Sequence, residues 1–156
     1  MTTTSLPSVI ISDTNGLILL TKIGWLELLR NLFSRCFITP IVAAEYGRPL
    51  PEWLEVHSPA GSLPEGIILR SIHPGEYSAL VLALETPDSL LLLDDAPARQ
   101  VAQQLQLSHT GTLGLLILAK SRGLLAHVRP VLAELRAAGM WVSDAVAENI
   151  CQAAGE

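Results

Sequence analysis

Residues 90–95 read Leu-Leu-Leu-Leu-Asp-Asp, a short run of apolar side chains that ends in two carboxylates. Such a run is typical of a strand buried on both faces of a parallel sheet. A similar run comes early in the chain, where Val9-Ile10-Ile11-Ser12 is followed by Asp13. Ligands of parallel sheets bind at the edge formed by the carboxyl ends of the strands. The two stretches therefore predict a sheet with acidic side chains at its functional edge.

Around these strands, helical and extended patterns alternate. Further strands are expected at residues 36–39, 53–56, 67–69 and 107–109. Helices are expected at residues 15–35 in two pieces divided by Gly24, from Thr39-Pro40 to Gly47, and at 74–85, 96–105, 112–122, 130–138 and 143–153. This alternation predicts an α/β fold with a central, mainly parallel sheet.

The composition suits one globular domain over residues 1–156, with 49% hydrophobic and 16% charged residues. No apolar stretch reaches the roughly 18 to 20 residues that span a bilayer. Residues 1–8 lack an apolar signal core, so we expect a cytoplasmic protein. Cys36 and Cys151 show no ligand spacing and are expected to be inert, buried thiols.

The formal net charge of −5 counts against a simple nucleic-acid coat protein, which carries a basic face. It does not exclude a nuclease, because an acidic site loaded with a divalent metal becomes locally positive. The charge therefore directs attention to the acidic residues.

Acidic residues occur at the ends of the expected elements. Asp13, Asp94 and Asp95 follow strands, while Glu76 lies in the first turn of the helix that begins at Pro74. Asp13, Asp95 and Glu76 can each also act simply as helix caps. Glu45 is different, because it lies in the last turn of its helix, where the dipole disfavours a carboxylate. An indifferent surface position is the alternative for Glu45.

Together, several carboxylates at one sheet edge repel each other, so they favour a bound proton or cation. Hard oxygen ligands of this kind suit Mg²⁺ or Mn²⁺. The histidines are scattered and are expected to be non-ligands: His57, His73, His109 and His127. The turn Thr110-Gly111-Thr112-Leu113-Gly114 opens a helix, so it can hold a phosphate or be a tight turn capped by Thr112.

The ordered set of motifs resembles the PIN-domain family over about residues 9–155. The matching motifs are Ser-Asp-Thr-Asn at 12–15, Thr-Pro-x-Val-x-x-Glu at 39–45, Gly-Glu-Tyr-Ser-Ala at 75–79, Leu-Asp-Asp at 93–95 with Ala98-Arg99, Thr-Gly-Thr-Leu-Gly at 110–114, and Ala119-Lys120-x-x-Gly123. The chain looks most like the VapC-like subgroup of this family.

The resemblance implies a three-layer α/β/α fold and a quartet of acids that bind Mg²⁺ or Mn²⁺. The first three acids are Asp13, Glu45 and Glu76, where the family more often has Asp at the third position, and the fourth is Asp94 or Asp95. Asp13 and Asp95 would be the main metal ligands, with Glu45 and Glu76 holding metal through water or orienting the nucleophile.

Further site residues follow from the same resemblance. Thr112 and Asn15 would position the phosphate. Arg99 and Lys120 are candidates for contacting RNA, with a solvated role as the alternative for each.

The activity implied is that of an endoribonuclease toxin of a prokaryotic toxin–antitoxin pair, which cleaves RNA phosphodiester bonds by metal-activated water. A small antitoxin protein and a second copy of the chain would be its partners. The apolar closing helices and Trp141 can contribute to an interface, or the helices can simply pack on the sheet.

Two other functions fit part of the pattern. A phosphatase-like hydrolase with an aspartyl nucleophile would want Asp where Asn15 stands and a Lys before the acidic pair, whereas Lys120 follows it. A catalytically silent PIN-like binding module would keep the fold without the chemistry, although all the candidate acids are present.

Overall fold

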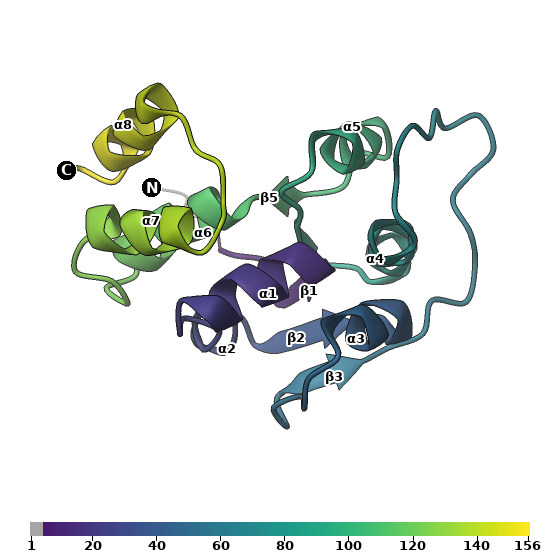
Figure 1. Cartoon of the computed structure of the whole chain (residues 1–156). Coiled ribbons are helices and arrows are strands. Elements are labelled where there is room, and N and C mark those ends of the chain that lie inside the picture. The colour runs from purple at the N-terminus through teal and green to yellow at the C-terminus, as the bar shows by residue number, and fades with distance from the viewer. Residues whose placement is uncertain (1–4) are drawn as a thin grey trace.

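The strands form a single parallel sheet. The structure is a computed structural model that describes residues 5–156, and residues 1–4 of the polar N-terminal stretch lie outside the described residues. Within the described residues, the sheet has the order β3-β2-β1-β4-β5, and every neighbouring pair is parallel (Figure 1). The strands are β1 (Val9–Ser12), β2 (Arg35–Ile38), β3 (Leu54–Val56), β4 (Ser89–Leu92) and β5 (His109–Thr110).

Strand β1 lies at the centre of the sheet. Ile10 stands opposite Cys36 of β2 on one side and Leu90 of β4 on the other. Every residue of β1 is buried, as expected for a strand covered on both faces. The central position of β1 and β4 puts the residues that follow them in the middle of the carboxyl edge.

Helices cover both faces of the sheet (Figure 1). They are α1 (Thr14–Lys22), α2 (Leu28–Leu32), α3 (Pro40–Tyr46), α4 (Pro74–Glu85), α5 (Ala96–Gln104), α6 (Thr112–Ser121), α7 (Val128–Ala137) and α8 (Asp144–Ala153). The predicted α/β/α fold with a parallel sheet is confirmed.

The alternation of side chains along β1 divides the core into two layers. Val9 and Ile11 pack with α4 and α5 on one face. Ile10 packs with α1, α2, α3 and α6 on the other. The closing helices α7 and α8 bury their apolar sides against α6 rather than directly against the sheet, which differs from the simpler packing considered above.

Some predicted boundaries were wrong. Ile67–Leu69 is not a strand: Ile67 turns into the core beside α4 and α5, whereas Ile68 is 61% exposed. The last strand is His109–Thr110 instead of 107–109, because the Leu91 and Leu93 N–H groups donate to the carbonyls of Ser108 and Thr110. Whether a segment forms a strand, and where that strand begins and ends, depends on pairing with a neighbouring strand. The local sequence pattern does not reveal this pairing.

Two other sequence expectations concern the cysteines and membrane-spanning segments. Cys36 and Cys151 are both buried and free, as expected for inert thiols. Within residues 5–156, no helix combines the length and the apolar character needed to cross a membrane.

Candidate functional site

A pocket of about 550 Å³ lies at the carboxyl edge of the sheet, and its lining residues come from the starts of α1, α4 and α5 and from the last turn of α3. It is lined by Asp13, Thr14, Asn15, Ile18, Glu45, His73, Glu76 and Asp95. Four of the predicted acids therefore meet in one pocket, and we call it the acidic pocket.

Asp13 forms the buried wall of the acidic pocket. It follows β1 directly, is 2% exposed, and caps α1 by accepting a hydrogen bond from the Gly16 N–H at 2.8 Å. Burial, together with the smaller effect of the Asp94 and Glu76 charges, raises the pKa of Asp13 to about 7, and the Gly16 hydrogen bond opposes this rise. The cap uses one oxygen of a carboxylate that has about four acceptor sites, so capping leaves the group able to bind a cation.

Glu45 reaches the acidic pocket from α3 because Gly75 makes room for it. A Cβ on Gly75 would collide with the Glu45 carboxylate oxygen Oε1, and it would lie 3.2 Å from Thr14 Oγ1. Glu45 is exposed as a residue, but its carboxylate stands against the first turn of α4. The contact explains why an acid at the unfavourable end of α3 lies at this edge of the sheet.

Glu76 and Asp95 lie close enough in the acidic pocket to form an acidic pair. Glu76 is 8% exposed and accepts a hydrogen bond from the His73 N–H at 3.1 Å. Asp95 caps α5 by accepting from the Ala98 N–H at 3.3 Å. Burial raises the pKa of Glu76, and the nearby Asp95 carboxylate raises it further against the His73 hydrogen bond. Such a pair favours a shared proton or a cation.

A buried hydroxyl pair holds α3 and α4 together beside the acidic pocket. Thr39 caps α3, and its hydroxyl lies 2.7 Å from the Ser78 hydroxyl of α4. Ser78 also donates to the Gly75 carbonyl at 2.8 Å. Because both side chains are buried, these bonds fix the relative position of the helices that carry Glu45 and Glu76.

Asp94 lies beside the acidic pocket instead of lining it. Its two carboxylate oxygens accept hydrogen bonds from the Thr112 N–H at 2.8 Å and from the Thr112 hydroxyl at 2.6 Å. The start of α6 is therefore bound to a carboxylate of the same chain. This contact occupies the Thr112 N–H and hydroxyl of the turn that was expected from the sequence as a possible phosphate site.

The predicted RNA-contacting residues are not brought together. Arg99 donates from Nε to the Leu93 carbonyl at 2.9 Å, and its guanidinium lies against Gly111. Lys120 pairs with Glu156 at 3.0 Å, in the last turn of α6. The rise of a helix puts Lys120 about 12 Å along α6 from Thr112. Only Asn15 of this group lines the acidic pocket.

Three lining residues were not predicted: Thr14, Ile18 and His73. Thr14 Oγ1 is buried without a hydrogen-bond partner among residues 5–156. Each had a positional signal, since Thr14 follows Asp13, Ile18 lies one helical turn further, and His73 is the cap before Pro74. The sequence motifs drew attention to acids and so passed over their neighbours.

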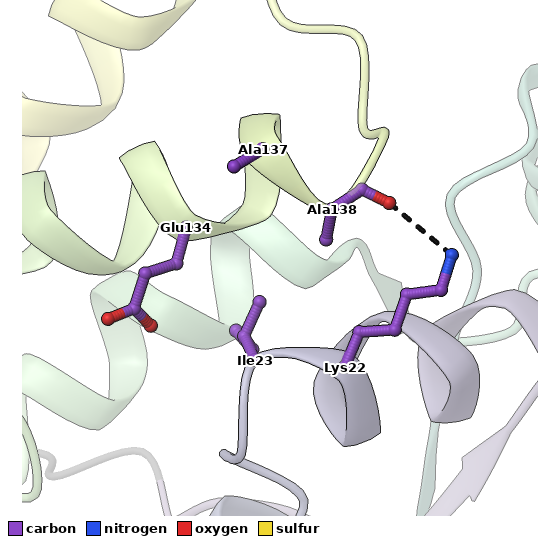
Figure 2. A pocket seen from close by; sticks show the side chains of 5 residues that line it. All are labelled: Lys22, Ile23, Glu134, Ala137 and Ala138. Carbon is purple, nitrogen blue, oxygen red and sulfur yellow. Dashed lines mark hydrogen bonds between the residues drawn. The ribbon is translucent and has the colours of Figure 1, made fainter.

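A second cavity of about 560 Å³ lies between the ends of α1 and α7 (Figure 2). It is lined by Lys22, Ile23, Glu134, Ala137 and Ala138. Lys22 donates from Nζ to the Ala138 carbonyl at 3.4 Å. We call it the α1–α7 cavity; its one acid and one base give it no convergent chemistry.

The acidic pocket suits a divalent cation in the chemistry of its donors. Its acids are hard oxygen ligands, and burial, followed by the charges of Asp94 and Glu76, raises the pKa of Asp13, so a cation would stabilise its ionised form. Among residues 5–156, no three His, Cys, Asp or Glu side chains are already arranged to hold an ion. Binding would therefore require the carboxylates to turn toward the centre of the pocket.

Comparisons with known proteins address the family of the chain. The family model DUF3368, described as a PIN domain, matches residues 9–156. No curated protein and no solved structure gives a match. The matched range includes every residue that lines the acidic pocket.

Proposed function

Since the chain belongs to the PIN-domain family, whose members are typically nucleases, we propose that it is a metal-dependent endoribonuclease. The proposal extends to a VapC-like toxin of a prokaryotic toxin–antitoxin pair. One observation carries it: Asp13, Glu45, Glu76 and Asp95 line a single pocket at the carboxyl edge of a parallel sheet.

The chemistry needs a way to offset negative charge, because a phosphodiester gains charge as it is attacked. When bound, Mg²⁺ or Mn²⁺ supplies that positive charge and lowers the pKa of a water molecule. Asp13 caps α1 and Asp95 caps α5, so the two carboxylates enter the pocket from different elements, and they are the ligands we assign. Glu45 and Glu76 accept hydrogen bonds from the attacking water and so orient it.

Polar groups beside the acids contribute to substrate positioning. Asn15 lies in the first turn of α1, and the Thr14 hydroxyl next to it has no hydrogen-bond partner within the described residues. Both can donate to a phosphate oxygen. Asp94 acts as a positioning residue in this proposal, because its carboxylate is held by Thr112.

The proposed partners are RNA, a small antitoxin protein and a second copy of the chain. Trp141, between α7 and α8, is 86% exposed and supports an interface on that side of the molecule. Large exposed aromatic side chains are enriched where proteins meet.

The test is cleavage of single-stranded RNA and of tRNA in Mg²⁺ or Mn²⁺, with single-stranded DNA and p-nitrophenyl phosphate as alternative substrates. We expect the wild type to cut RNA, and we expect EDTA and Asp13→Ala each to abolish cutting. Release of nitrophenol without RNA cleavage would favour the phosphatase-like alternative. Equal cleavage by wild type and Asp13→Ala would refute the assigned site.

A catalytically silent binding module is the second candidate function. It is favoured by one observation, namely that no three metal-binding side chains are pre-arranged within residues 5–156. A calorimetric titration with Mn²⁺ distinguishes the two functions. Saturable binding that is lost in Asp13→Ala supports the nuclease, and no binding supports the silent module.

A further inference from the structure

A smaller pocket of about 290 Å³ lies beside the acidic pocket, between α5 and the loop that leads into α4. It is lined by Ile68, Arg70, Pro97, Gln100 and Gln104. We propose that this pocket binds the nucleotide that flanks the cleaved phosphate of a single-stranded RNA. The inference rests on the proposed ribonuclease function and names a part of its substrate site.

The two pockets share their supporting segments. Asp95 lines the acidic pocket, and Pro97 of the same helix start lines the smaller one. On the loop side, His73 lines the acidic pocket and Arg70 the smaller one. Residues two or three positions apart lie within about 11 Å of each other along the chain. A strand of RNA that leaves the acidic pocket therefore reaches the smaller pocket within one or two nucleotides.

Arg70 supplies a free positive charge at this position. Within residues 5–156, five of the ten lysines and arginines form ion pairs with acids, and Arg70 is among the five that do not; the paired residues are Arg30, Arg35, Lys120, Arg129 and Arg136. Arg70 is exposed and forms neither an ion pair nor a side-chain hydrogen bond with any of residues 5–156. In a chain with a net charge of −5, an unpaired guanidinium beside the acidic pocket suits a phosphate of the substrate.

Gln100 and Gln104 present carboxamides along one side of α5. They are four residues apart, so they lie one above the other on the same helix face. Gln104 Oε1 accepts from the Ile68 N–H at 3.5 Å, which leaves its amide N–H groups free. A carboxamide offers both donors and acceptors, as the edge of a nucleobase requires.

Ile68 supplies an apolar surface in the same pocket. Its neighbour Ile67 and the nearby Ile72 turn into the core, whereas Ile68 is 61% exposed. The pocket thus combines a cation, two amides and an apolar side chain. The cation suits the phosphate of one nucleotide, the amides suit the edge of its base, and the apolar side chain suits the face of that base. Single-stranded RNA exposes all three.

The experiment compares the wild type with Arg70→Gln, and uses Arg122→Gln as the matched control, because Arg122 is exposed at the end of α6. Cleavage of a fluorescein-labelled single-stranded RNA gives KM and kcat in Mg²⁺. Anisotropy of the same RNA in Ca²⁺ gives Kd over a range of salt concentrations. Both substituted side chains, Arg70 and Arg122, are on the surface, so the unfolding midpoints of the three proteins should agree.

We expect Arg70→Gln to raise KM about 10-fold with kcat within about twofold, because the residue binds RNA away from the reacting atoms. Loss of one phosphate contact should also flatten the salt dependence of binding by about 0.7 in the slope of log K against log salt. Arg122→Gln should match the wild type. The pair Gln100→Ala and Gln104→Ala should leave the salt slope unchanged and reduce the preference between RNAs that differ in the flanking base.

The outcomes separate this inference from the proposed function. RNA cleavage with the same KM and salt slope in wild type and Arg70→Gln overturns the inference and leaves the nuclease standing. Absence of cleavage by the wild type refutes the nuclease, and the Ca²⁺ measurement then decides the inference. Binding that depends on Arg70 keeps the pocket as an RNA site, and absence of binding overturns it.

Discussion

The acidic pocket and the α1–α7 cavity have nearly the same volume, about 550 Å³ and 560 Å³. They differ in where their charged groups stand. Asp13 and Glu76 of the acidic pocket are 2% and 8% exposed, whereas Lys22 and Glu134 of the α1–α7 cavity are exposed residues. Convergence and burial of like charges, rather than volume, therefore distinguish a candidate active site.

The burial of Asp13 in the acidic pocket also has an energetic consequence. A pKa of about 7 for Asp13 means that the ionised carboxylate is disfavoured in the fold. Relative to the ordinary value of 3.8, this corresponds to about 4 kcal/mol. A buried carboxyl group with a strongly raised pKa, at the carboxyl edge of a parallel sheet, is typical of a functional site.

Neutralising one acid in each cavity should produce the largest difference between the two cavities. Asp13→Asn keeps an acceptor for the Gly16 N–H but removes the charge. We expect it to reduce RNA cleavage by at least about 1,000-fold, because the cation that offsets transition-state charge contributes several kcal/mol. Glu134→Gln in the α1–α7 cavity should leave the rate unchanged. Rates measured under single-turnover conditions would contradict the comparison if both variants lost activity equally.

The pH dependence of stability in EDTA is the next largest expected effect. The folded pKa of Asp13 is raised to about 7, so its stabilising contribution is fully present below about pH 4 and is lost as pH rises toward 7. The free energy of unfolding of the wild type, minus that of Asp13→Asn, should fall by up to about 4 kcal/mol over this window. Urea titrations from pH 4 to 8 measure this difference. A difference that does not change with pH would show that Asp13 is not strained by burial.

Added bulk should likewise affect the two cavities unequally. Gly75→Ala introduces a Cβ that collides with the Glu45 carboxylate, and we expect cleavage to fall about 10- to 100-fold. Helix propensity favours Ala over Gly by about 1 kcal/mol, so the variant should still fold. Ala137→Leu adds bulk to the α1–α7 cavity and should leave cleavage unchanged. Full activity of Gly75→Ala would show that the position of Glu45 is not needed.

The smallest expected effect concerns Asp94. Asp94→Asn weakens its contact with the start of α6, and we expect a loss of about 1 kcal/mol in stability with less than a 10-fold loss in rate. Asp95→Asn, in the acidic pocket, should show the opposite balance. Thermal unfolding and cleavage rates of the two variants measure both quantities. A larger rate loss in Asp94→Asn would reverse the assignment of the two acids.

Local sequence signals predicted much of the fold. The Thr39-Pro40 start, the Pro74–Glu85 helix and the division of the first helical region at Gly24 all appear as predicted. Each depends on a few consecutive residues, such as a cap followed by proline or a glycine with positive φ. Sequence identifies such features because their cause is local.

Features with a distant cause were not predicted. Helix α7 begins at Val128 and not at Pro130, because the Glu156 carboxylate accepts hydrogen bonds from the Val128 and Arg129 N–H groups. The two contacting segments are nearly thirty residues apart, and no local pattern connects them. Tertiary contacts of this kind set element boundaries that propensity leaves open.

The site shows the same division. The motifs identified the acids, but they did not separate Asp94 from Asp95, because the separation depends on Thr112 reaching back to Asp94. They also gave no reason for Gly75, whose role depends on the approach of Glu45 from α3. The residue types were evident from sequence, whereas their partners required the fold.

The close approach of Glu45 to Gly75 has an evolutionary consequence. A side chain at position 75 would displace the Glu45 carboxylate, so the present position of Glu45 depends on a glycine at position 75. Relatives of this chain should therefore show correlated substitutions, with glycine at 75 accompanying glutamate at 45, and alanine or serine at 75 accompanying aspartate. Although thirty positions of sequence separate the two residues, we expect selection to act on both positions together.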